Sequence, residues 1–166
     1  PPNSPWPSVI FCSEAGLDSG KGMIRLTRIL DRALSPDATL TLTLANRVRS
    51  RLRVTLDDGR EAGLFLERGL SLKDGDLLGG EEAGGPVIQV RAAPERLSVA
   101  DCSDPLLLAR ACYHLGNRHL AIQIQADRLS YLQDPVLDGM LRGLGLAVRD
   151  ELGPFEPEPG AYAGGA

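Results

Sequence analysis

Short runs of alternating apolar and polar residues dominate the chain between Met23 and about Ala93. Alternation with a period of two is typical of β-strands that are buried on one side. Turn residues separate these runs, whose approximate bounds are 23–30, 40–45, 48–56, 64–66 and 87–91. No stretch with helical spacing occurs among them, so the pattern predicts a small β-rich domain over residues 23–93.

A tight hairpin is predicted at Asp57-Asp58-Gly59, between two of these runs. A two-residue loop would mix charged and apolar side chains on each face. A three-residue loop gives one apolar face, with Leu52 opposite Leu64, and puts Gly59 where a positive φ is needed. The sequence therefore favours the three-residue loop, and it predicts a second turn at residues 73–76.

The pattern changes after Pro94, where apolar residues recur twice at helical spacing. Each helical segment opens with Asp-Pro, at residues 104–105 and 134–135. The Asp can accept hydrogen bonds from the free N–H groups of the first turn, and Pro suits the first helical position. Gly116 and Gly145 are expected to end the helices. Strands are expected around them at residues 96–102, 120–126, 129–132 and 146–152.

This βαββαβ order predicts a ferredoxin-like domain over residues 94–153. The fold class is therefore expected to be α+β, with a small β-rich N-terminal domain followed by a ferredoxin-like domain. Residues 1–22 are rich in Pro, Ser and Gly and are expected to form a flexible extension. Residues 154–166 lack periodicity and are expected to be an exposed strand or a flexible tail.

Composition excludes several classes of function. A net charge of −4 and an aromatic content of 4% argue against binding of nucleic acid. No apolar stretch reaches the ~18 residues needed to cross a bilayer, and no secretory signal is expected. Three cysteines without a CxxC motif, Cys12, Cys102 and Cys112, fit a reducing compartment, and the last two are expected in the core. A soluble, cytoplasmic protein is predicted.

Residues suited to catalysis are scarce. The chain has no G-x-S-x-G, HExxH or P-loop sequence, and its two histidines have no partnered nucleophile. His114 is expected on a last helical turn, where an interaction with the helix C-terminus is its simplest role. His119 is expected at a corner between helix and strand, either as a structural residue or as a metal ligand. The chain is therefore not expected to be an enzyme.

The run from Arg110 to His119, RACYHLGNRH, resembles the central motif of UreE, a family of urease accessory proteins. Similar segments occur in the same order at residues 51–62, 136–142 and 154–162, so that the resemblance covers about residues 23–162. It implies a partner- or peptide-binding N-terminal domain, and a ferredoxin-like domain that binds metal and dimerises. Members bind nickel, and the implied partners are a urease accessory GTPase and the urease apoprotein complex.

The resemblance also implies a homodimer with His119 at the subunit interface. Nickel accepts nitrogen and oxygen ligands, and two His119 side chains could share one ion across a two-fold axis. The chain departs from the family pattern at Pro135, which stands where a histidine is frequent, and at its end, which carries no histidine. The predicted function is a nickel metallochaperone for urease. The alternative is a non-metal scaffold or peptide-binding module in urease maturation, with His119 structural.

Four arginines alternate at the start of one predicted strand and would share one of its faces. They could form a charged outer face that prevents edge-to-edge pairing, or a docking stripe for an acidic partner. These residues are Arg47, Arg49, Arg51 and Arg53.

Overall fold

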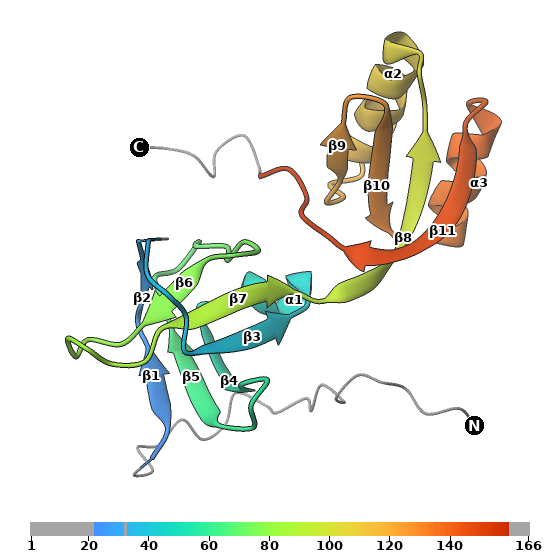
Figure 1. The fold of residues 1–166 in the computed structure, drawn as a ribbon. Coiled ribbons are helices and arrows are strands. Elements are labelled where there is room, and N and C mark those ends of the chain that lie inside the picture. Colours follow the sequence, from blue (N-terminus) through green and yellow to red (C-terminus); the bar gives the residue numbers. More distant parts are fainter. Residues whose placement is uncertain (1–21, 32, 160–166) are drawn as a thin grey trace, which may run out of the picture.

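The structure is a computed structural model that describes residues 22–31 and 33–159. Two domains are joined where β7 leads into β8 and where β11 ends (Figure 1). The elements of the N-terminal domain are β1 (Ile24–Leu26), β2 (Arg28–Leu30), β3 (Ala38–Leu42), α1 (Leu44–Arg47), β4 (Arg51–Thr55), β5 (Glu61–Phe65), β6 (Leu77–Gly79) and β7 (Ile88–Ala92). Those of the C-terminal domain are β8 (Pro94–Asp101), α2 (Pro105–Gly116), β9 (Gln123–Gln125), β10 (Arg128–Leu132), α3 (Pro135–Gly143) and β11 (Ala147–Pro154).

The N-terminal domain consists of two small sheets around one apolar core. One sheet has the strand order β1-β5-β4 and the other β2-β6-β7-β3, with β1 parallel to β5 and β3 parallel to β7. Because alternate residues of each strand face inward, both sheets contribute to the same cluster. Its fully buried members include Leu26, Leu40, Leu64, Leu72, Leu78, Ile88 and Val90.

The predicted hairpin register is confirmed. Leu52 of β4 lies opposite Leu64 of β5. The loop closes with a hydrogen bond of 2.8 Å from Leu56 N to Arg60 O, and Gly59 has a φ of 90°. A positive φ of this size costs glycine little. The matching of apolar faces was therefore enough to determine the loop length.

Two expectations for this domain are wrong. A four-residue helix, α1, follows β3, although no helical periodicity marks it. One turn is too short to produce a period, and a distant side chain supports it, since Leu44 N donates to Glu95 Oε2 at 2.8 Å. The four arginines therefore share no strand face. Arg47 ends α1 and is 1% exposed, Arg49 lies between elements, and only Arg51 and Arg53 belong to β4.

The C-terminal domain has the predicted βαββαβ order. Its sheet is antiparallel throughout, with the strand order β11-β8-β10-β9 of a ferredoxin-like domain. Both helices pack on one face of this sheet (Figure 1). The predicted caps are confirmed, because Asp104 Oδ1 accepts from Leu106 N at 2.9 Å and Asp134 Oδ1 accepts from Val136 N at 2.8 Å.

The residues after β11 correct the expectation of an exposed strand or a flexible tail. β11 extends to Pro154, and the next side chain, Phe155, is fully buried against Leu97 and Val99 of β8. These contacts involve the sheet face opposite the helices, so this face also has a small core next to α1. The rest of the predicted tail, residues 160–166, and all but Gly22 of the predicted extension lie outside the described residues.

Candidate metal-binding site

A tight turn follows the last residue of α2 and carries His119. Helical hydrogen bonding continues past Gly116, with Asn117 N donating to Tyr113 O at 3.0 Å and Arg118 N to Leu115 O at 3.0 Å. His119 N then donates to Gly116 O at 2.9 Å. The amides that follow the helix are thus satisfied by its last carbonyl groups. Gly116 is part of α2 and lacks the left-handed backbone expected of a glycine stop.

His119 itself takes the left-handed conformation, with a φ of 56°. Within residues 22–31 and 33–159 it is the one non-glycine residue with a positive φ. This backbone costs an L-residue about 1–2 kcal/mol. After it, Leu120 and Ile122 pack against the domain core. The turn therefore points the chain back toward the sheet while His119 remains exposed.

The His119 imidazole has no hydrogen bond or ion pair among the described residues. His114 is also exposed, on the last turn of α2 as predicted, and it meets the Tyr113 ring edge-on with centroids 5.4 Å apart. Neutral imidazole nitrogen is a common ligand of divalent transition metals. His119 therefore has the chemistry and the access of a metal ligand.

The cysteines of this domain are poor candidates for metal ligands. Cys102 is buried and its Sγ donates to Asp104 O at 3.2 Å, which confirms the core position predicted for it. Cys112 is half-buried beside the core, and burial raises the pKa of its thiol. A raised pKa keeps sulfur protonated, whereas metals bind the thiolate. Cys12 lies outside the described residues.

The segment between β10 and α3 has a structural role. Tyr131 donates a hydrogen bond of 2.7 Å from its hydroxyl to Asp138, and both side chains are buried. Burial, together with this bond to the carboxylate, raises the pKa of Tyr131. Pro135 stands at the first position of α3, beside the Asp134 cap. These residues fasten α3 to the sheet, a role that sequence reasoning missed apart from the cap.

Comparison with known proteins connects this architecture to one family. The model of the C-terminal domain of the UreE urease accessory protein matches residues 95–166, and the model of its N-terminal domain matches residues 26–93. The chain belongs to the UreE family. The resemblance inferred from the sequence and the predicted two-domain fold class are thereby confirmed. UreE is a family of accessory chaperones and not of enzymes.

Individual relatives cover most of the chain. The urease accessory protein UreE of Pseudomonas putida (strain W619) is 61% identical over 140 residues, which are 84% of this chain and 86% of the relative. That of Alkalilimnicola ehrlichii is 56% identical over 142 residues, 86% of each chain. That of Escherichia coli O157:H7 is 52% identical over 141 residues, 85% of this chain and 91% of the relative. Both domains therefore align together with these relatives.

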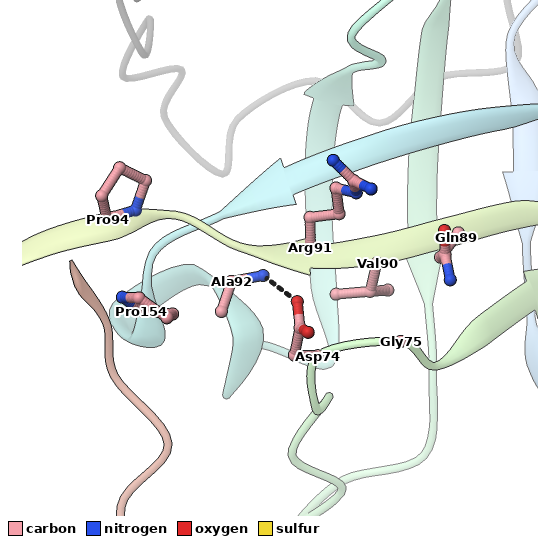
Figure 2. Close-up of a pocket in the computed structure, with 8 residues that line it drawn as sticks. All are labelled: Asp74, Gly75, Gln89, Val90, Arg91, Ala92, Pro94 and Pro154. Atoms are coloured by element: carbon pink, nitrogen blue, oxygen red, sulfur yellow. Dashed lines mark hydrogen bonds between the residues drawn. The ribbon is translucent and has the colours of Figure 1, made fainter.

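Other surfaces of this UreE family member offer less for binding. No three His, Cys, Asp or Glu side chains among the described residues form a group that could hold a metal ion. A shallow cavity at the domain junction lies between the 74–75 turn, β7, Pro94 and Pro154 (Figure 2). Its carboxylate, Asp74, accepts a hydrogen bond of 2.8 Å from Ala92 N. No helix in the described part of the chain is long and apolar enough to cross a membrane.

Proposed function

We propose that this protein is a homodimeric nickel metallochaperone that delivers nickel for assembly of the urease active site. The observation that carries the proposal is the exposed imidazole of His119, without an internal partner in the described residues, on a turn where a histidine costs backbone energy. Membership of the UreE family connects this metal role to urease. Nickel is the cargo of the protein, and it must be released after it has been bound.

A two-fold dimer would provide two histidine ligands from a chain that has a single candidate ligand, His119. One imidazole holds a divalent ion weakly, whereas two copies of His119 related by symmetry could share one nickel ion. Such a site would be open to solvent and to a receiving protein. The partners that fit this role are a urease accessory GTPase and the urease apoprotein complex, in the cytoplasm. Free Cys102 and Cys112 are compatible with that reducing compartment.

Calorimetric nickel titration of the metal-free protein tests the proposal. The wild type should bind one nickel ion tightly per dimer, with the dimer measured by analytical ultracentrifugation. His119→Ala should lose this site and keep its circular dichroism spectrum. His114→Ala is the matched control, because His114 is an exposed histidine of the same segment, and it should bind nickel like the wild type.

Retention of wild-type nickel stoichiometry and affinity by His119→Ala would contradict the proposal. The alternative would then be a scaffold or peptide-binding module for urease maturation, in which His119 only shapes the turn. Several tight nickel ions per dimer would also contradict a single shared site.

A further inference from the structure

The four residues after β11, 155–158, are here called the strap, and they are bound to the N-terminal domain through a buried arginine. Arg47 of α1 is 1% exposed. Its guanidinium donates to Leu72 O at 3.2 Å, to Phe155 O and to the Glu156 carboxylate. The same carboxylate accepts a hydrogen bond of 3.2 Å from Asp74 N. Arg47 Nε has no hydrogen-bond partner among the described residues, so the two terminal nitrogens make all the bonds of this buried charge. Because a buried charge needs such partners, these contacts hold the strap against the N-terminal domain.

The strap is also bound to the C-terminal domain. Glu156 N donates to Gln123 Oε1 at 3.0 Å, and Glu158 N donates to Ile122 O at 2.7 Å. Figure 1 shows the chain leaving β11 at the junction of the domains and continuing beside β9. Glu156 is therefore bonded to the N-terminal domain through its side chain and to the C-terminal domain through its backbone.

The residues that the strap contacts lie directly after the metal-binding turn. Ile122 and Gln123 are three and four residues beyond His119. On the other flank, the amides of the turn donate hydrogen bonds to the last carbonyl groups of α2. β9 is a three-residue edge strand that pairs with β10 alone, so the strap adds contacts to a weakly held flank. The position of the His119 imidazole depends on both flanks.

We propose that Arg47 and Glu156 are positioning residues for His119, and that the strap couples the N-terminal domain to the metal-binding turn. This inference rests on the proposed metal role of His119. Coupling between two sites is reciprocal. A protein partner that shifts the N-terminal domain away from the strap would loosen the turn and favour nickel release. Nickel bound at His119 would in turn tighten the strap.

The test uses two variants that cut the strap and one matched control. Glu156→Ala removes the carboxylate that Arg47 and Asp74 N contact, and Gln123→Ala removes the acceptor of Glu156 N. Glu158→Ala is the control, because the Glu158 side chain is exposed and makes no bond among the described residues, whereas its N–H, which contacts Ile122, is retained. Amide hydrogen exchange is measured on the metal-free dimers, and nickel affinity is measured by calorimetry.

Both strap variants should exchange the amides of residues 119–125 about tenfold faster, and in Gln123→Ala, which leaves the Arg47–Glu156 pair intact, β8 and α3 should keep their wild-type protection. Their nickel affinity should fall by about tenfold, the low end of the cost of losing a partner that orients a metal ligand. Glu158→Ala should match the wild type in both measurements. In the wild type, nickel should slow exchange at Glu158 N.

Two outcomes would overturn the inference. Unchanged exchange at residues 119–125 in the strap variants would show that the strap does not hold the turn. Faster exchange with wild-type nickel affinity would show that it holds the turn without positioning the ligand. Failure of the proposed function is a different result, in which His119→Ala itself binds nickel like the wild type. The exchange data on metal-free protein do not depend on that result.

Discussion

The domain junction and the turn that carries His119 place nitrogen-bearing side chains in opposite environments. At the junction, the Arg47 guanidinium is almost fully buried and donates to two backbone carbonyls and a carboxylate. At the turn, the His119 imidazole is exposed and has no partner among the described residues. A permanent charge inside a protein must be satisfied by the fold itself. A side chain that binds and releases a ligand must instead leave its coordinating atom accessible. The presence of hydrogen-bond partners within the protein therefore distinguishes a side chain that stabilises the fold from one that is free to bind a ligand.

Arg47→Ala should have the largest effect on stability. It leaves Leu72 O and Phe155 O without the Arg47 donor, and it leaves Glu156 without its charged partner, with only the bond from Asp74 N. Breaking a buried ion pair costs about 3 kcal/mol at the low end, which applies because Glu156 is 35% exposed. The free energy of unfolding, measured by urea denaturation, should fall by this amount. Arg51→Ala is the control, since Arg51 is exposed, and it should change the value by less than about 0.5 kcal/mol. Equal losses of unfolding free energy in the two variants would mean that the buried arginine of the junction contributes no more to stability than an exposed arginine.

Tyr131→Phe should lower the free energy of unfolding by about 2 kcal/mol at neutral pH, because Asp138 stays buried and loses its donor. The double variant Tyr131→Phe/Asp138→Leu should recover part of this loss, because it removes the unsatisfied carboxylate. A loss in Tyr131→Phe below about 0.5 kcal/mol would mean that the hydrogen bond does little to fasten α3.

The same tyrosine predicts an alkaline effect. The pKa of Tyr131 is raised in the folded state, so that an unfolded tyrosine, with a pKa of ~10, releases its proton first. The contribution of Tyr131 to stability is therefore complete below pH ~10 and is lost as the pH rises further. The difference in unfolding free energy between wild type and Tyr131→Phe should shrink by about 1.4 kcal/mol per pH unit above that point. A constant difference from pH 9 to pH 11 would contradict the raised pKa.

Substitutions of His119 can separate its backbone role from its chemical one. His119→Gly relieves the left-handed backbone and should be more stable than His119→Ala by about 1 kcal/mol, measured by thermal or urea unfolding. Both variants lack the imidazole, so both should lose nickel binding. If His119→Ala were as stable as His119→Gly, the positive φ at this turn would not lower the stability of the folded protein.

Charge reversal on the outer face of β4 should have the smallest effect. Arg51 and Arg53 are exposed, and Arg53 pairs with Glu61 at 3.0 Å. Surface pairs contribute about 0–1 kcal/mol, so Arg51→Glu/Arg53→Glu should change stability little. Its association with the accessory GTPase or the urease apoprotein should slow a few-fold at low salt, and nickel titration should be unchanged. If the variant associates at the wild-type rate and with the wild-type salt dependence, these arginines form only a solvated strand face.

Contacts between near neighbours were determined by the sequence itself. The Asp-Pro pairs predict both long helices because a side-chain cap and a fixed proline φ act within one turn. The three-residue hairpin follows from matching apolar residues across a short loop. The run ending in His119 is similarly local, and together with the similar segments on both sides of it, it predicted the family that the comparisons confirm.

Only the tertiary structure decided which residues lie inside at the junction. Arg47 and Glu156 are 109 positions apart, and alternation suggested that the first was an exposed strand residue and the second part of a tail. Two signals were available: Phe155 is an aromatic residue in a Pro- and Glu-rich segment, and residues 154–162 resemble a segment of the family. The positive φ of His119 was also not predicted: histidine is more frequent than most residues at positive φ, but such backbones are too rare for one histidine to indicate one. Periodicity reports which face a residue takes within its own element, whereas burial of a charge depends on acceptors brought from elsewhere in the chain.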